Sequence, residues 1–269
     1  MDQKLFKKYC DFIYRQSGIH LTDRKEALVE GRIAKRMRVL TIPTHEQYFD
    51  FVTSDAGKEE ISRMLDTIST NVTHFYRESA HFDYLHNNLV TWAQGGQRSF
   101  TFWSAASSSG EEPYTMGIIA KEALSSFPGS DLRILATDIS GPMLLRCSTA
   151  EYAEESLEKL PPALRNNWFS TIRQDGEKRY IVADEIRRLL TIKRLNLSKP
   201  PFPMKGPFDV VFIRNVMIYF DLSVKQQLIS EAYRLLKPGG ILCIGHSESL
   251  TGIKHNFKTE QPAAYRKPL

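Results

Sequence analysis

Apolar residues recur at helical spacing through roughly the first 90 residues of the chain. In LFKKYCDFI the apolar side chains fall on one helical face, and Gly18 follows as a stop signal. Thr22 or Asp23 is placed to cap a second helix, and Thr44 to cap a third. The predicted helices lie near residues 5–17, 24–38, 46–52 and 58–68. We therefore predict an N-terminal all-helical domain over residues 1–75.

From about residue 100 the pattern changes, and short β-rich runs alternate with helical ones. FDVVFIRNV is a nearly continuous apolar run, which is typical of a strand in a sheet covered on both faces. Such alternation predicts a doubly wound parallel sheet. The predicted strands are SFTFWSA, LRILATDIS, LLTIKRLNL, FDVVFIRNV and GILCIGHSES, the helices are GEEPYTMGIIAKEALSS, GPMLLRCSTAEYA and SVKQQLISEAYRLL, and KPGG is a predicted turn.

One segment, at about residues 160–190, interrupts the alternation. It contains QDGEKRYIV, in which Asp175 and Gly176 are a favourable turn pair between two short β runs. We interpret it as a small antiparallel β insertion within a second domain, residues 76–269. The predicted fold class is α/β, with a Rossmann-like, doubly wound, mostly parallel sheet, an N-terminal helical domain and this insertion.

The composition is that of an ordinary globular protein. Of 269 residues, 42% are hydrophobic and 25% charged. No apolar run approaches the ~20 residues of a membrane span, and the start MDQKLFKKYCDFIYRQ lacks the features of a secretory signal. The net charge of +5 is spread along the chain and does not indicate nucleic-acid binding. We expect a cytoplasmic monomer with no membrane insertion and no nucleic-acid partner.

Cysteine and histidine spacing gives no sign of a metal site. Cys10, Cys147 and Cys243 lie far apart, which fits neither a disulfide framework nor a zinc site. His81 and His86 are five residues apart and would not share a helical face. We expect no bound metal.

The stretch TFWSAASSSGEEPYTMG suggests the chemistry. It contains the first strand-to-helix turn of the predicted sheet, where such folds hold nucleotide-like ligands, and its small residues allow close approach to the backbone. It contains no G-x-G-x-x-G, no Walker A motif and no cations for a pyrophosphate. Glu111 and Glu112 instead indicate a cationic or amine group, although one of them can serve only to complement the helix N-terminus.

Asp138 ends the next predicted strand, in ATDIS. An acid at this position of a doubly wound sheet reaches ribose hydroxyls, and the alternative is that Asp138 caps the following helix. A ribose, an amino group and no phosphate together describe S-adenosylmethionine, which is the cofactor that we expect, with S-adenosylhomocysteine as its product.

Five motifs, in register over nearly the whole chain, make a resemblance specific. They are STNVTHFYRE (69–78), WSAASSSGEEPYTMG (103–117), ATDIS (136–140), RNVMIYF (214–220) and LKPGGILCIGHSES (236–249). In these motifs the chain resembles the CheR family of chemoreceptor glutamate methyltransferases. The resemblance implies methyl transfer from S-adenosylmethionine to the γ-carboxylate of receptor glutamates, which forms methyl esters for sensory adaptation.

The resemblance also implies roles for individual residues. Glu111 would meet the amino group of the cofactor and Asp138 its ribose. Arg214 and Tyr219 would be the catalytic pair at the methyl-transfer end. Arg214 would also contact the cofactor. The remaining cofactor-binding residues would be Asn71, Thr73, Arg77 near the methionyl carboxylate, Asn196 and Leu197 at the adenine, and Asn215.

Methyl transfer to a carboxylate needs no general base, because the nucleophile is already ionised at neutral pH. Arg214 would pair with the substrate carboxylate through two hydrogen bonds. The hydroxyl of Tyr219 would position the carboxylate or the sulfonium, and the alternative is that Tyr219 is only a buried aromatic residue.

The predicted helix from Arg24 to Arg38 is rich in basic residues. It is either a solvated face or a docking surface for the acidic methylation helices of a receptor.

The β insertion looks too short to bind a receptor tether, so we expect the enzyme to act without one. Two rival interpretations keep part of this account: a methyltransferase with another substrate, or a non-catalytic S-adenosylmethionine-binding signalling module.

Overall fold

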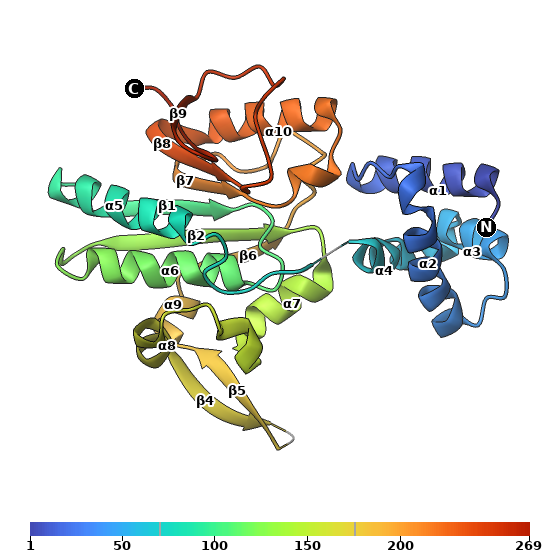
Figure 1. Ribbon diagram of the computed structural model, residues 1–269, viewed down its shortest axis with the longest axis horizontal. Helices are drawn as coiled ribbons and strands as arrows, with labels where there is room; N and C mark the ends of the chain where they lie inside the picture. The colour runs from blue at the N-terminus through green and yellow to red at the C-terminus, as the bar shows by residue number, and fades with distance from the viewer. Residues whose placement is uncertain (70, 175) are drawn as a thin grey trace.

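The chain begins with a helical bundle. In this computed structural model, which describes residues 1–69, 71–174 and 176–269, the bundle comprises four α-helices and two short 3₁₀ turns (Figure 1). They are α1 (Gln3–Ser17), η1 (Asp23–Lys25), α2 (Glu26–Leu40), α3 (His45–Thr53), η2 (Asp55–Gly57) and α4 (Lys58–Ile68). Their apolar faces meet in one core, with fully buried Tyr9, Ile13, Ile33 and Tyr48 at its centre.

Local sequence signals set most of these helix ends. Gly18 adopts a left-handed conformation, φ 74°, and ends α1 where the sequence predicts. Thr44 caps α3 through a 3.2 Å hydrogen bond that its hydroxyl accepts from the backbone N–H of Gln47. The prediction for the second helix start is wrong, because Thr22 precedes the 3₁₀ turn without making a side-chain cap and α2 begins at Glu26.

The second part of the chain is built on a seven-stranded sheet in the order β6-β2-β1-β7-β8-β10-β9. The strands are β1 (Ser99–Ser104), β2 (Asp131–Asp138), β6 (Leu190–Arg194), β7 (Phe208–Ile213), β8 (Leu236–Ile244), β9 (Lys258–Gln261) and β10 (Ala264–Arg266). All pairings from β6 to β8 are parallel, and the two C-terminal strands are antiparallel. The predicted doubly wound fold is therefore confirmed. The sequence analysis misses β9 and β10, and KPGG lies inside β8 rather than in a turn.

Helices cover both faces of the sheet, as Figure 1 shows. α5 (Ala80–Gln94) and α6 (Glu111–Leu124) pack on one face against Val210 and Phe212 of β7. α10 (Leu222–Leu235) packs on the other face against Val211 and Ile213. Every residue of β7 is buried, which explains its continuous apolar sequence. α7 (Gly141–Thr149) follows β2 and packs beside β6.

The antiparallel insertion is a three-stranded sheet in the order β3-β5-β4. Its strands are β3 (Glu151–Tyr152), β4 (Phe169–Gln174) and β5 (Glu177–Val182), accompanied by η3 (Glu154–Leu157), α8 (Pro162–Trp168) and α9 (Asp184–Arg187). It begins at Glu151, earlier than predicted, because AEYA leaves the predicted helix and enters β3. The predicted Asp175–Gly176 turn includes Asp175, which lies outside the described residues.

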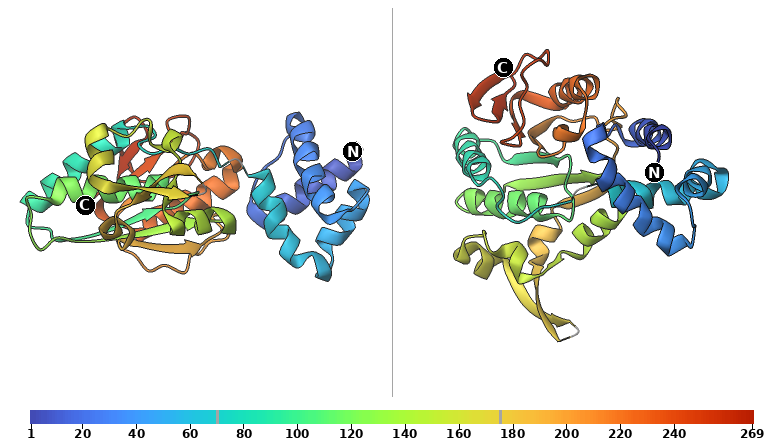
Figure 2. Two further views of the ribbon diagram at one scale, coloured as in Figure 1. Left: turned by 90° about the horizontal axis from the view of Figure 1, so that it is seen from below. Right: turned by 45° about the vertical axis from the view of Figure 1, so that its right-hand side comes forward.

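The helical bundle lies beside the carboxyl ends of the parallel strands (Figure 2). Tyr14 donates a 2.6 Å hydrogen bond to Asp221, and Asn196 donates one of 2.8 Å to the backbone oxygen of Gln16. Ile19 forms an isolated antiparallel bridge with Phe220. The segment between α4 and α5, in which the predicted domain boundary falls, crosses this junction. Among the described residues, no helix combines the length and apolarity that crossing a membrane requires.

Candidate cofactor and methyl-transfer site

A pocket opens at this junction between the bundle and the sheet. Its floor comes from the residues that follow β1, β2, β6 and β7, the edge at which doubly wound sheets bind ligands. Its other walls come from α1, α2 and the segment between α4 and α5. About 1240 Å³ of empty space, which includes open solvent at its mouth, lies between these walls. It brings together nine of the ten residues predicted for the site: Asn71, Thr73, Arg77, Asp138, Asn196, Leu197, Arg214, Asn215 and Tyr219.

The exception is Glu111. Its carboxylate is buried away from the pocket lining, accepts a 2.7 Å hydrogen bond from the Ser109 hydroxyl, and acts electrostatically on Cys147 and Tyr152. Glu112 lines the pocket instead, with hydrogen bonds of 2.7 Å from the Ser104 hydroxyl and 2.9 Å from Arg214. The resemblance assigns the amino group of the cofactor to Glu111, whereas of the two adjacent acids it is Glu112 that lines the pocket.

The small-residue turn before α6 has a steric cause. Gly110 has φ 103°, and a Cβ there would lie 2.7 Å from the sulfur of Cys147 and 2.8 Å from the hydroxyl of Tyr152. That hydroxyl donates a 2.7 Å hydrogen bond to the Ser109 carbonyl, which ties the small sheet to the turn. Ser108 lines the pocket, and its buried hydroxyl makes no hydrogen bond to the described residues. An unpaired buried hydroxyl suits a polar ligand.

Asp138 lies where β2 ends, 8% exposed. Its carboxylate accepts backbone hydrogen bonds of 2.8 Å from Ser108 and 2.9 Å from Ser140. Burial raises the pKa of Asp138 above its ordinary value, and these two hydrogen bonds partly oppose the shift. The helix cap that we considered for Asp138 is supplied by Ser140, whose hydroxyl accepts from the Met143 N–H. Asp138 is thus a preorganised carboxylate facing the pocket.

Arg214 lies at the end of β7 with its guanidinium almost fully buried. It forms ion pairs with Glu112 at 2.9 Å and with Glu78 at 3.1 Å, and donates to the carbonyl of Arg77. Burial acts to raise the pKa of Glu112, and Arg214 partly opposes this. Both terminal nitrogens of Arg214 are therefore occupied, and only its buried Nε has no hydrogen-bond partner among the described residues. A two-point clamp on a substrate carboxylate would require Arg214 to release Glu78 or Glu112.

The segment between α4 and α5 lies along one side of the pocket. Asn71 and Thr73 are half-buried and line it. Arg77 donates a 2.7 Å hydrogen bond to the carbonyl of Val72, which folds its side chain back along the segment. Val72 itself is 72% exposed at the pocket rim. Arg77 is therefore positioned to meet an anionic group of a ligand.

The opposite side of the pocket is flatter and more apolar. Leu197 is buried in the core beneath α10, and the oxygen of the Asn196 amide accepts from the Ser198 N–H and hydroxyl. Tyr219 lies in η4 (Met217–Tyr219), half-buried, with the ammonium of Lys25 5.4 Å from its ring centre. Tyr219 lines the pocket, so it is more than a buried core aromatic residue.

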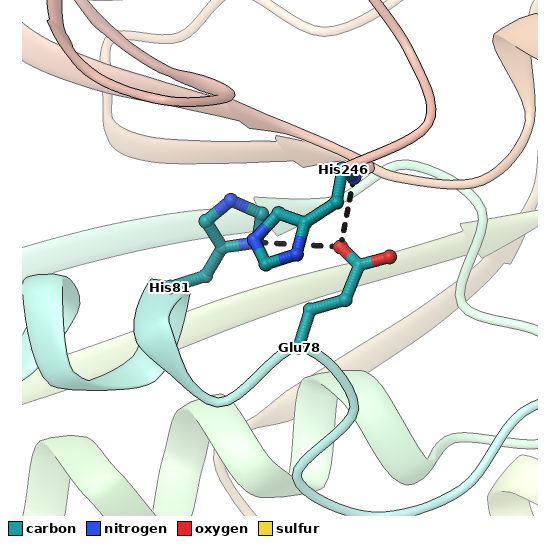
Figure 3. Close-up of side chains that lie close together, drawn as sticks. All are labelled: Glu78, His81 and His246. Carbon is teal, nitrogen blue, oxygen red and sulfur yellow. Dashed lines mark hydrogen bonds and ion pairs between the residues drawn. The ribbon is translucent and has the colours of Figure 1, made fainter.

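A cluster that spacing along the chain does not reveal lies behind Arg214. Glu78, His81 and His246 offer ligand atoms within 4.8 Å of one another, from the turn before α5, its first helical turn and the loop after β8 (Figure 3). The sequence analysis paired His81 with His86, which the fold does not bring together in this cluster. The only feature of the sequence that points to this cluster is the three-residue spacing of Glu78 and His81.

The basic helix is less exposed than its composition suggests. Arg36 forms a bidentate pair with buried Glu60, at 2.7 and 2.8 Å, and Arg32 donates to the carbonyls of Ile68 and Ser69. Both arginines thus serve the bundle itself. The exposed cations of this region are Arg24, Lys35 and Arg38.

A pocket at the carboxyl edge of a doubly wound sheet, lined by the carboxylates of Asp138 and Glu112, is typical of a nucleoside-binding Rossmann-like fold. Comparisons with known proteins specify the class. Residues 4–69 match the family described as CheR methyltransferase, all-alpha domain, and residues 71–265 match CheR methyltransferase, SAM binding domain. The chain belongs to the CheR methyltransferase family and is an S-adenosylmethionine-dependent methyltransferase.

Curated relatives align with this chain over nearly their full length. A probable chemotaxis protein methyltransferase of Rhizobium etli is 38% identical over 259 residues, 94% of this chain and 96% of that protein. The chemotaxis protein methyltransferase of Borreliella burgdorferi is 34% identical over 261 residues, 95% and 91% of the two chains. That of Escherichia coli is 31% identical over 260 residues, 97% and 89% of the two chains.

Proposed function

We propose that this enzyme transfers a methyl group from S-adenosylmethionine to the γ-carboxylate of glutamate side chains on the cytoplasmic methylation helices of chemoreceptors. The observation that carries the proposal is the pocket itself. It combines Asp138 and Glu112 with Arg77, and it opens between the sheet and a bundle that bears exposed cations. The relatives' names, and the match of both domains, support this choice of substrate.

In our proposal the cofactor lies along the carboxyl edge of the sheet. Asp138 accepts hydrogen bonds from the ribose hydroxyls, and Leu197 and Asn196 border the adenine. Glu112, rather than Glu111, meets the amino group, and Arg77 pairs with the methionyl carboxylate, so that both charged groups on the α-carbon of the tail have a charge-assisted partner. Asn71 and Thr73 line the same side of the pocket. Asn215, which follows Arg214, borders the methyl-transfer end.

The reaction is a single displacement. The glutamate carboxylate oxygen bonds to the methyl carbon as the carbon–sulfur bond breaks, and the electron pair of that bond leaves with the sulfur. No proton moves, so no general base is required. The protein must instead desolvate the carboxylate and align it with the carbon–sulfur bond.

Two side chains are placed to provide this alignment. The hydroxyl of Tyr219 has no hydrogen bond recorded to the described residues and lines the pocket, so it is available to the substrate carboxylate. Arg214 contributes positive charge from behind, fixed by Glu78 and Glu112. Because Glu78 and Glu112 already occupy its terminal nitrogens, Arg214 acts on the nucleophile from a fixed position and without a two-point clamp, so it does not over-stabilise the ground state.

The receptor would approach over the bundle. Arg24, Lys35 and Arg38 are exposed, and they are suited to the acidic face of a methylation helix. The antiparallel hairpin β4–β5 is short, six residues in each strand, and in our proposal it serves no receptor tether. We expect the enzyme to act as a cytoplasmic monomer.

The experiment that tests this function uses labelled S-adenosylmethionine and receptor-containing membranes. Alkali should release the label as methanol, because carboxyl methyl esters are base-labile. Label that survives alkali would indicate N-methylation and another substrate class. Receptors whose methylation-site glutamates are changed to alanine provide the control, and they should accept no label.

A further inference from the structure

The turn that leads from the cofactor-binding segment into α5 is strained. Tyr76 and Glu78 have φ values of 59° and 55°, a left-handed conformation that side chains with a Cβ rarely adopt. Such a conformation persists only where the surrounding structure fixes it. Between them lies Arg77, whose carbonyl accepts from Arg214 and whose guanidinium donates to Val72. The two strained positions therefore flank Arg77, the residue that we assign to the cofactor's carboxylate.

The side chain of Glu78 fixes this turn to the sheet. One carboxylate oxygen accepts hydrogen bonds of 3.1 Å from Arg214 and from the backbone N–H of His246, and the other accepts one of 3.1 Å from the Asn215 amide. Figure 3 shows the bond from His246. These partners follow β7 and β8, so one carboxylate joins three chain segments. Asn215 also has a positive φ, 59°, so Glu78 contacts a second strained position.

His81 is an uncharged, buried side chain beside Glu78 in this cluster. It is fully buried, its Nδ1 lies 3.6 Å from Glu78, and neither ring nitrogen has a hydrogen-bond partner among the described residues. Burial, together with the nearby charge of Arg214, lowers the pKa of His81 to about 3. Two histidines and a carboxylate are also the ligand set of a transition-metal site. However, both carboxylate oxygens of Glu78 already accept from Arg214 and Asn215, and the guanidinium would repel a metal cation there.

We infer that Glu78 is a positioning residue of the methyl-transfer site. Its carboxylate holds Arg77 on one side, and Arg214 and Asn215 on the other, in the arrangement in which they face the cofactor and the substrate. Glu78 itself does not line the pocket. This inference rests on the proposed position of the cofactor, which titration of the unaltered protein with S-adenosylhomocysteine tests separately.

The test compares Glu78→Gln with Glu231→Gln. Glu231 is a matched control, because its side chain is 12% exposed against 16% for Glu78 and it also pairs with an arginine, Arg234, and accepts from a backbone N–H, that of Phe202. It does not line the pocket. Each variant is measured for thermal melting, for S-adenosylhomocysteine affinity by calorimetry, and for kcat and KM with receptor membranes.

We expect Glu78→Gln to weaken cofactor affinity and to lower kcat, each about tenfold or more, since charge-assisted hydrogen bonds are lost at both Arg214 and Asn215. Glu231→Gln should lower the melting temperature by a similar amount and leave affinity and kcat unchanged. Glu78→Asp, which keeps the charge but is one methylene shorter, should resemble Glu78→Gln and provides the comparison if the latter does not fold.

Three results would overturn the inference. The first is a Glu78→Gln variant that loses thermal stability but keeps its affinity and kcat. The second is full activity in Glu78→Asp, which would mean that charge alone, not position, matters. The third is loss of activity of the unaltered enzyme on treatment with EDTA and its recovery with Zn²⁺, which would assign Glu78, His81 and His246 to a metal. Failure of the unaltered protein to bind S-adenosylhomocysteine would instead refute the proposed position of the cofactor.

Discussion

Glu111 and Glu112 are adjacent in the sequence, but their side chains point in different directions. Substituting each of them in turn is therefore the most informative test of this site. Glu111→Gln and Glu112→Gln each remove one negative charge and keep the size of the side chain. Glu112 lines the pocket, whereas Glu111 does not and lies near Tyr152 and Cys147. Each member of the pair is therefore the control for the other.

The expected change in cofactor affinity follows from the groups with which each carboxylate forms hydrogen bonds. In our account Glu112 accepts from the ammonium group of the cofactor, and a hydrogen bond to a charged group contributes about 1.5–3 kcal/mol, which corresponds to a roughly 10- to 150-fold change in affinity. Glutamine at 112 keeps an acceptor for the Ser104 hydroxyl, and Arg214 keeps Glu78, so the local fold should survive. Glutamine at 111 keeps an acceptor for Ser109 and removes a buried charge, so cofactor affinity should not change.

The assay is calorimetric titration with two ligands. S-adenosylhomocysteine carries the amino-acid tail, and 5′-methylthioadenosine has the same nucleoside and thioether without it. We expect Glu112→Gln to lose affinity for the first ligand and to keep it for the second. Equal losses for both ligands would show that Glu112 supports the pocket rather than the amino group. A greater loss in Glu111→Gln than in Glu112→Gln would refute the assignment outright.

Four further predictions follow from the same geometry. Asp138→Ala should weaken binding of both ligands in the same titration with little loss of thermal stability, because ionised Asp138 is buried at a cost. Burial raises the pKa values of Asp138 and Glu112, so on acidification cofactor affinity should begin to decline at pH values above the ordinary carboxyl pKa values of 3.8 and 4.5. The contribution of Asp138 to this decline should vanish in Asp138→Ala. A decline confined to lower pH would contradict the argument that burial raises these pKa values. Tyr219→Phe should lower kcat about 10- to 100-fold with unchanged S-adenosylhomocysteine affinity, and a change in affinity alone would make Tyr219 a cofactor contact. Lys35→Glu with Arg38→Glu should raise the KM for receptor at low salt and leave cofactor affinity unchanged, whereas Arg36→Glu should lower the melting temperature, because it breaks the buried pair with Glu60.

The fold follows from the sequence because its signals are local. The all-buried strand β7, the small-residue turn and the acid that ends β2 fix the sheet and its ligand-binding edge. The antiparallel strands β9 and β10 are harder to predict, since they have only four and three residues and carry little apolar alternation. KPGG reads as a turn by composition, yet the backbone N–H of Gly239 donates to the carbonyl of Lys267 and the Lys267 N–H donates to the carbonyl of Gly240, which holds Gly239, φ 78°, in an irregular strand.

The sequence predicts which residue types form the site, but it does not predict the direction in which each side chain points. Consecutive helical residues point roughly 100° apart, so Glu111 and Glu112 cannot be separated until α6 is docked on the sheet. Arg36 appears in the sequence as one cation among several, and only the fold brings Glu60 against it. Glu78 is overlooked for the same reason, because its partners follow strands more than 130 residues away.

The central claim is that the pocket between the helical bundle and the sheet holds the cofactor. The most direct measurement is a crystal structure of the protein with S-adenosylhomocysteine. Our account predicts both ribose hydroxyls within hydrogen-bonding distance of Asp138, the amino group at Glu112, and the sulfur facing Tyr219. A ligand bound outside this pocket, or bound in it with the ribose remote from Asp138, would contradict the account.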